Sequence, residues 1–126
     1  MEKQHTTLLL TVNTNSTDQK YKQILRETAL KFMKNIGTFL TFRGKFDKPK
    51  ISNIKTEYCI ETSTKGLIHT HILCTITHTP KVKKDKVLFN LNYVRKYFDK
   101  LTNRHCYVNC RFSGDSAWNL SMYLKK

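Results

Sequence analysis

Two histidines, His69 and His71, stand two residues apart in the apolar run IHTHI. Side chains two apart on a β-strand project to the same side, so both imidazoles would lie on one face of a sheet. Two glutamates, Glu57 and Glu61, occur in the preceding alternating segment. Two imidazoles and one carboxylate form a ligand set for a divalent metal, and three protein ligands leave coordination positions open. The residue types therefore predict a catalytic rather than a structural metal site.

A β-hairpin is predicted to bring the glutamates to the histidines. Residues 54–61 and 67–77 both alternate apolar and polar, and the five residues TSTKG between them end in Gly66. If this hairpin closes symmetrically, residue i pairs with residue 128 − i, and odd-numbered residues face odd-numbered residues. Both histidines then share their face with four residues of the other strand: Lys55, Glu57, Cys59 and Glu61.

This register leaves the identity of the carboxylate ligand open. Glu57 would pair directly with His71, whereas Glu61 would pair with Leu67 and lie diagonal to His69. Diagonal neighbours are still within reach of long side chains. On the hairpin geometry alone, either glutamate can complete the metal site.

A second group of reactive side chains lies at the end of the chain. Residues 114–126 are predicted to form a short helix, in which Lys126 follows Tyr123 by three residues and Asn119 precedes it by four. Residues at these spacings are neighbours on a helix surface. A tyrosine hydroxyl has a pKa of about 10, and a nearby ammonium favours the phenolate. The same ammonium can also hold a phosphate.

The remaining elements must build the sheet and cover one face of it. Ser16 and Gln19 have capping-box spacing, and Gly37 is predicted to end the helix that follows. Loops are predicted at 47–53 and at the basic cluster 81–86. The other predicted elements are a strand at 6–13, a helix at 17–36, a strand at 38–46, a helix at 90–102 and a strand at 105–112.

This order of elements predicts an α+β fold with one domain, residues 1–126. An antiparallel central sheet of about five strands would carry both main helices on one face, as in RRM-like and ferredoxin-like folds. The even-numbered apolar residues of the hairpin would pack under the helices. The opposite face, which carries the histidines, would be open or lightly covered and available for binding.

Charge is the strongest signal in the composition. The 126 residues include 23 Lys and Arg but only 9 Asp and Glu, which gives a net charge of +14. Such an imbalance in a small domain favours a polyanionic partner, nucleic acid before an anionic membrane. An apolar content of 39%, with 4 Gly and 2 Pro, is typical of a folded globular chain and not of a disordered or fibrous one.

Other sequence features bear on the cellular setting. No apolar run approaches the length of a membrane span, and the N-terminal MEKQHTT lacks the pattern of a secretory signal, so an intracellular setting is expected. None of the four cysteines forms a CxxC pair. Cys106 and Cys110 would lie about 13 Å apart on a strand, too far for a disulfide. We therefore expect free thiols.

Together these features resemble the HUH endonucleases, specifically the replication-initiator (Rep) domains of rolling-circle plasmids and single-stranded DNA viruses. LLTVN at 9–13 is similar to their first-strand motif, HTH at 69–71 to their two-histidine motif, and YLKK at 123–126 to their Y-x-x-K motif. The order and spacing of the motifs cover the whole chain. Thr70 departs from the bulky apolar residue that usually separates the histidines, but it is predicted to point towards the helices.

The resemblance implies sequence-specific, metal-dependent nicking of single-stranded DNA that initiates rolling-circle replication. A Mg²⁺ or Mn²⁺ ion held by Glu61, His69 and His71 would polarise the scissile phosphate. The distance of Glu61 from the histidines fits the family better than that of the rival carboxylate, Glu57. The phenolate of Tyr123 would attack in line and leave a 5′-phosphotyrosine link and a free 3′-OH, so strands can also be rejoined. Lys126 would steady the phosphate.

The same resemblance implies how DNA is bound and where the protein works. Single-stranded DNA at a replication origin would cross the open sheet face, with contacts from Asn13, Arg104 and Asn119, and with His105 as a further candidate. Family members often continue into a linker and a helicase domain, so the chain would be an excised domain or an unusually short protein with a possible helicase partner. No membrane partner is expected. The expected location is wherever the replicon is copied, in the host nucleus or cytoplasm.

Three alternatives stay open. An HUH transposase acting on single-stranded transposon ends would use the same chemistry. A non-catalytic single-stranded nucleic-acid-binding domain on an RRM-like sheet would need exposed aromatic residues at central strand positions, where this chain offers histidine and glutamate. A non-haem iron oxygenase also uses two histidines and a carboxylate, but the small size and the charge of +14 argue against it.

Overall fold

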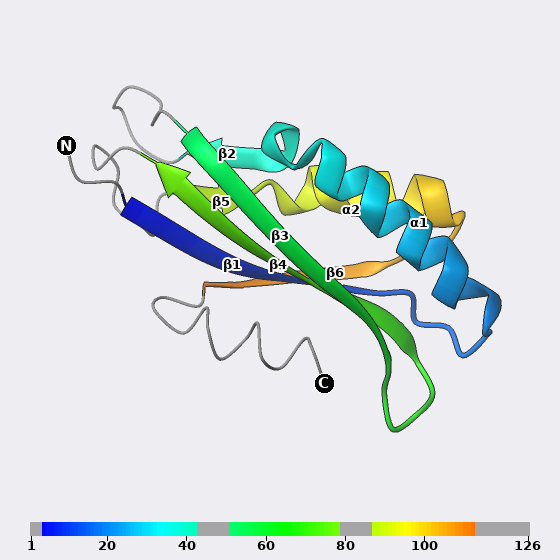
Figure 1. Cartoon of the computed structure of the whole chain (residues 1–126). Helices are drawn as coiled ribbons and strands as arrows, with labels where there is room; N and C mark the ends of the chain where they lie inside the picture. The colour runs from blue at the N-terminus through cyan, green and yellow to red at the C-terminus, as the bar shows by residue number, and fades with distance from the viewer. Residues whose placement is uncertain (1–3, 43–50, 79–86, 113–126) are drawn as a thin grey trace.

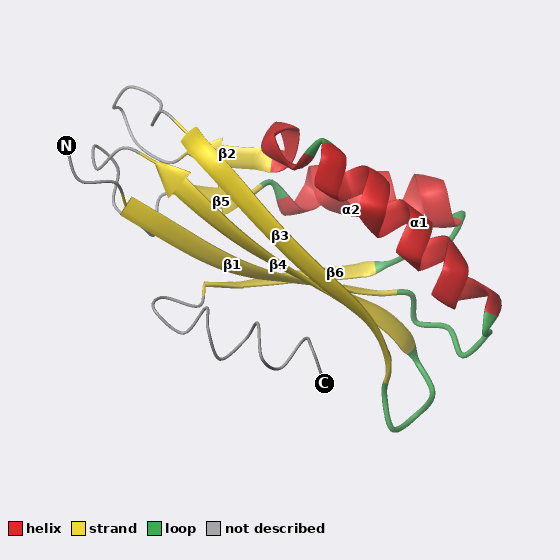
Figure 2. Cartoon of the chain, viewed as in Figure 1, coloured by secondary structure: helices red, strands yellow, loops and turns green. Residues whose placement is uncertain are grey.

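The computed structural model describes residues 4–42, 51–78 and 87–112. It confirms the predicted α+β class, with helices on one face of an antiparallel sheet (Figures 1 and 2). In chain order the elements are β1 (Gln4–Asn13), α1 (Lys20–Lys34), the 3-10 helix η1 (Ile36–Phe39), β2 (Leu40–Phe42), β3 (Ile51–Thr62), β4 (Ile68–His78), β5 (Val87–Phe89), α2 (Leu91–Thr102) and β6 (Tyr107–Phe112).

The strands form two sheets rather than one. The main sheet has four strands in the order β3-β4-β1-β6, and every neighbouring pair is antiparallel. The short strands β2 and β5 pair separately. The prediction of about five strands in one sheet counted β2 with the main sheet and missed β5, because three residues are too few to show an alternating pattern.

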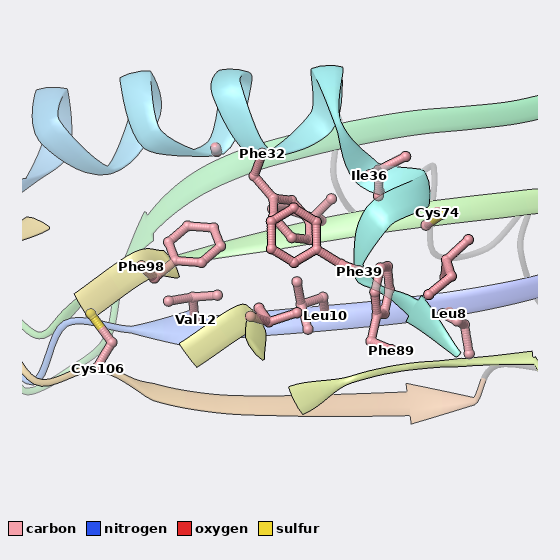
Figure 3. Packing of buried hydrophobic residues seen from close by; sticks show 14 of the residues in the cluster. Leu8, Leu10, Val12, Phe32, Ile36, Phe39, Cys74, Phe89, Phe98 and Cys106 are labelled. Atoms are coloured by element: carbon pink, nitrogen blue, oxygen red, sulfur yellow. The ribbon is translucent and has the colours of Figure 1, made fainter. Parts of the chain in front are cut away.

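The hydrophobic core lies between the main sheet and the two helices (Figure 3). Even-numbered residues of the central strands, such as Leu10 and Ile72, are fully buried there, as the alternation predicted. Phe32 of α1 lies at the centre, with ring centroids 4.5 Å from Phe39 and 5.3 Å from Phe98. Burying a side chain of this size stabilises the fold by about 1.5–3 kcal/mol, so this core holds the sheet in place beneath the helices.

The start of α1 differs from the predicted capping box. The helix begins at Lys20 rather than at residue 17, and its N-cap, Gln19, makes no capping hydrogen bond through its side chain. The Ser16 hydroxyl instead accepts a hydrogen bond from the Asp18 amide, and the Asp18 carboxylate accepts one from the Lys20 amide. Such local turns compete with helical capping for the same donors, which explains the later start.

The predicted stop of this helix was also placed too late. The helix ends at Lys34, and Asn35 is its C-cap. Gly37 lies inside η1, a tighter turn that continues the helical path for four more residues. Strand β3 begins at Ile51, inside the predicted loop 47–53. Helix α2 and strand β6 lie within one or two residues of their predicted bounds.

None of the helices in the described ranges is long and apolar enough to cross a membrane. All four cysteines are free thiols, as predicted. Burial raises the pKa of Cys74 to about 12 and that of Cys110 to about 11. The predicted helix 114–126, the basic loop 81–86 and residues 43–50 lie outside the described residues.

Candidate metal centre

The pairing of β3 with β4 decides which side chains meet the histidines. Glu61 lies directly opposite His69, and Cys59 lies directly opposite His71. Paired residue numbers therefore add up to 130, and the predicted register, in which they add up to 128, is wrong by two residues. An even shift preserves the alternation of faces, so the predicted face of each residue is right even though its partner is not.

The turn explains this shift. The connecting loop runs from residue 63 to residue 67, one residue later at each end than TSTKG. The Ser63 amide donates to the Leu67 carbonyl at 2.9 Å, and the Gly66 amide donates to the Ser63 carbonyl at 2.8 Å. Gly66 has φ of +84°, a left-handed conformation that glycine adopts without a steric cost. Gly66 therefore lies inside the turn rather than at its end, so β3 extends one residue further than predicted and β4 begins one residue later.

The shifted register brings Glu61 to both histidines. Its Oε2 atom lies 3.4 Å from Nε2 of His69 and 3.5 Å from Nε2 of His71. The three residues offer ligand atoms that all lie within 4.8 Å of one another, and they are the one such group among the described residues. Glu57 lies opposite Leu73, two pairs beyond the Cys59–His71 pair, and is not part of the group.

These spacings suit a single ion. Two ligand atoms about 2.1 Å from one cation are about 3.4 Å apart at a tetrahedral angle and about 3.0 Å apart at a right angle. The nitrogen–oxygen separations of 3.4 and 3.5 Å are close to these values. Glu61, His69 and His71 can therefore hold a divalent metal with small side-chain adjustments.

Hydrogen bonds on the far side of each ring direct Nε2 towards Glu61. Nδ1 of His69 lies 3.3 Å from the Leu67 carbonyl, which can only accept, so the proton sits on Nδ1. Nδ1 of His71 lies 2.9 Å from the Thr11 hydroxyl on the neighbouring strand β1. The Thr11 hydroxyl can donate to or accept from this nitrogen, and in the tautomer that has its proton on Nδ1 His71 donates to Thr11. Such outer contacts fix the tautomer that leaves the Nε2 lone pair available to a metal.

The centre is shielded from solvent without being closed. The side chains of His69 and His71 are 14% and 15% exposed, and that of Glu61 is 33% exposed. Burial lowers the pKa of His71, and the neighbouring His69 lowers it further. A lowered pKa keeps His71 neutral at neutral pH, which is the form that binds metals.

Cys59 is a further member of this neighbourhood. Its thiol lies 3.7 Å from Oε1 of Glu61, so it can donate to one carboxylate oxygen while the other faces the histidines. Burial, and next the negative charge of Glu61, raise its pKa to about 11. Cys59 therefore remains a protonated thiol at neutral pH. The alternation of β3 placed it on this face, but the wrong register gave it the wrong partner.

Thr11 is a functional candidate that sequence reasoning missed, although it lies inside the quoted LLTVN motif. We expect Thr11→Val, which removes the hydroxyl and keeps the shape, to weaken Mn²⁺ binding about 10-fold or more, since loss of such an outer contact typically costs that much. Thr11→Ser should restore binding. Calorimetric titration with Mn²⁺ measures both. Equal affinity of the valine and serine variants would show that the hydroxyl does not orient His71.

The structure describes two of the residues predicted to contact DNA, and the strand pairing places one of them, Asn13, beside this centre. Asn13 on β1 pairs with His69 on β4, and its side-chain oxygen accepts a hydrogen bond from the Asn15 amide. Arg104 donates to the carbonyls of Thr14 and Asn15 at 2.6 and 2.9 Å. Arg104 thus holds the loop that follows β1. The third predicted contact, Asn119, lies outside the described residues, as do Tyr123 and Lys126.

Arg104 was predicted only as a DNA contact, but its hydrogen bonds indicate that it also stabilises the fold. Its guanidinium also lies 5.7 Å from the centre of the Tyr21 ring. We expect Arg104→Ala to lower the free energy of unfolding by about 1–2 kcal/mol, because two charge-assisted hydrogen bonds are lost. Urea unfolding followed by circular dichroism measures this change. An unaltered stability, with weaker DNA binding, would assign the side chain to DNA alone.

The open face of the sheet is not uniformly exposed. Leu9 and Leu73 are only 7% and 4% exposed and form a small second hydrophobic cluster there, packed against Cys59. Tyr107 on the edge strand β6 is by contrast 62% exposed. An exposed aromatic residue at the sheet edge was not predicted, because nucleic-acid-binding sheets of the RRM type carry their aromatic residues at central strand positions.

Comparison of the sequence with protein-family models gave no match, and comparison with curated proteins gave none either. The likeness to HUH endonucleases therefore depends on the three motifs in the sequence.

Proposed function

We propose that this chain nicks single-stranded DNA at a specific sequence and can rejoin the cut strand, through a tyrosine-linked intermediate and with the help of a divalent metal. The observation that supports this most strongly is the convergence of Glu61, His69 and His71 on the sheet face opposite the helices. The net charge of +14 supports a polyanionic substrate. The YLKK motif at 123–126 supplies the candidate nucleophile.

The reaction is a transfer of a phosphoryl group rather than a hydrolysis. The phenolate oxygen of Tyr123 forms a bond to the phosphorus of the scissile phosphodiester, and the bond from phosphorus to the 3′ oxygen breaks. The leaving oxygen takes up a proton and becomes a free 3′-OH. Attack by such a hydroxyl on the phosphotyrosine reverses the step and rejoins the strand. Starting rolling-circle replication is the role that this chemistry fits.

Different residues of the chain would bind the metal ion and contact the scissile phosphate. Glu61, His69 and His71 would hold a Mg²⁺ or Mn²⁺ ion, which supplies positive charge beside the phosphate. Hydrogen bonds of the two Nδ1 atoms with Thr11 and the Leu67 carbonyl hold both Nε2 atoms towards Glu61, where they could act as ligands to such an ion. The ammonium of Lys126 would hold a phosphate oxygen and favour the phenolate.

A labelled single-stranded DNA library of random sequence tests the proposal. After incubation with the protein and Mn²⁺, a denaturing gel should show a protein–DNA adduct when the label is at the 3′ end. A 5′ label should instead give a shortened free strand, because the 5′ fragment leaves with a 3′-OH. Mass spectrometry should map the adduct to Tyr123, and EDTA should prevent it. Cleavage with no adduct would indicate hydrolysis and would contradict the proposal.

A non-catalytic single-stranded nucleic-acid-binding domain is the second candidate. The 62% exposure of Tyr107 on the open sheet face favours it, because such domains stack bases on exposed aromatic rings. Binding of the library without cleavage, in Mg²⁺ and in Mn²⁺, would favour this candidate over the nickase.

A further inference from the structure

Tyr107 is the most exposed large hydrophobic residue of the described chain, at 62%. It lies on the same sheet face as the metal centre. The strand pairings place it in one row across the sheet, in which Tyr107 pairs with Asn13, Asn13 with His69, and His69 with Glu61. The exposed ring therefore continues the line that passes through the metal ligands.

The row also sets the distance between the ring and the metal centre. Neighbouring strands lie about 4.8 Å apart, so the backbone of Tyr107 is about 10 Å from that of His69. This separation corresponds to about one or two nucleotides of an extended single strand. A base stacked on Tyr107 would thus belong to a nucleotide next to, or one removed from, a phosphate at the centre.

The side chains that follow Tyr107 on the same face of β6 suit a nucleic-acid backbone. Asn109 pairs with Thr11, and Arg111 pairs with Leu9, so both lie on the open face, and both are exposed. Arginine and asparagine are common donors to phosphate oxygens. We call Tyr107, Asn109 and Arg111 the β6 strip. It combines an aromatic ring with donors and a positive charge, as single-strand binding grooves do.

We propose that Tyr107 is a stacking platform for a base of single-stranded nucleic acid, and that Asn109 and Arg111 contact the backbone of the same strand. The proposal rests on the proposed function for the nature of the ligand, but it concerns binding and not cleavage. The strip fixes where the strand leaves the metal centre, along β6 at the edge of the sheet. It also makes Tyr107 a determinant of which nucleotide lies at the centre.

Binding in EDTA separates this proposal from catalysis. The full chain is titrated into a fluorescent single-stranded oligonucleotide, and the change in anisotropy gives the affinity. Loss of one stacked base typically weakens binding about 5- to 100-fold, so we expect a change of that size in Tyr107→Leu. Tyr107→Phe, which keeps the ring, should bind within about 3-fold of the unaltered protein. Tyr93→Leu is the matched control, since Tyr93 is 51% exposed on α2, among the helices.

The salt dependence distinguishes the two parts of the strip. Arg111→Gln should lower the slope of log affinity against log salt by about 0.7, the value for one phosphate contact on a single strand. Tyr107→Leu should leave that slope unchanged, because stacking releases no counterions. A Tyr107→Leu variant whose slope falls as far as that of Arg111→Gln would contradict the stacking assignment.

The outcomes keep this proposal separate from the nickase. If Tyr107→Leu binds as well as the unaltered protein, or if Tyr93→Leu is weakened equally, Tyr107 is not a platform, whatever cleavage shows. If the library is never cut but Tyr107→Leu loses affinity, the stacking proposal stands and the nickase fails. Failure of the unaltered protein to bind single-stranded DNA or RNA would overturn the stacking proposal. Retained binding by Tyr107→Phe guards against loss through misfolding.

Discussion

Tyr123→Phe is expected to lower the rate of DNA nicking by about a thousand-fold or more, because removing the nucleophile removes the covalent step itself. The substitution deletes one oxygen atom and preserves the ring. Affinity for single-stranded DNA should therefore stay within about 3-fold of the unaltered protein. The rate is measured from the adduct band on a denaturing gel, and the affinity by fluorescence anisotropy.

Two other tyrosines give matched controls for that experiment. Tyr107→Phe and Tyr93→Phe remove the same atom from exposed rings on β6 and on α2. Both should keep the adduct, since neither hydroxyl is assigned to the chemistry. If Tyr123→Phe still forms an adduct, the nucleophile has been assigned to the wrong residue. If all three variants lose it, the effect is not specific to Tyr123.

Glu61→Ala is expected to weaken Mn²⁺ binding by more than about 100-fold, whereas Glu57→Ala should change it little. The estimate exceeds the 10- to 100-fold cost of losing an outer-shell contact, since a direct ligand is removed. Glu61 lies 3.4–3.5 Å from both imidazole nitrogens, and Glu57 lies opposite Leu73. Calorimetric titration measures both affinities, and nicking should fall in parallel with metal binding.

This pair of variants is well matched, because both glutamates lie on the same face of β3. The same charge is removed from the same strand in each case, so a difference in metal affinity reports on ligand position and not on net charge. His69→Ala and His71→Ala should behave as Glu61→Ala does, with the fold retained by circular dichroism. Greater damage from Glu57→Ala than from Glu61→Ala would move the carboxylate ligand to Glu57.

Much of the framework could be predicted because it depends on local periodicity. The alternation of β4 separates His69 and His71 from fully buried Ile68 and Ile72, and the structure confirms that separation. The spacing of Leu25, Ala29 and Phe32 similarly identified the buried face of α1. Burial of an apolar face is the dominant favourable term in folding, so a periodic apolar pattern determines which side of an element faces the core.

The register of the hairpin could not be obtained in this way. Registers that pair i with 128 − i and with 130 − i bury the same side chains, so the apolar pattern does not distinguish them. The difference lies in the turn, where Ser63 and Leu67 pair and Gly66 takes a left-handed conformation. A shift of two residues moved Glu61 from a diagonal position to one directly opposite His69. The apolar pattern therefore does not distinguish the two glutamates as metal ligands, whereas the hairpin register seen in the structure does.

The α+β class, the two helices, the faces of the strands and the residue types of the metal centre could all be predicted from the sequence, because each follows from local spacing and burial. Apart from the predicted β3–β4 hairpin, the order of the strands in the main sheet could be obtained only from the folded structure. Placing β1 between β4 and β6 gave His71 its hydrogen bond to Thr11 and placed Tyr107 in the row of His69. Contacts such as Thr11 with His71, 60 residues apart, and Asn13 with Tyr107, 107 − 13 = 94 residues apart, arise from strand order, which no local pattern encodes.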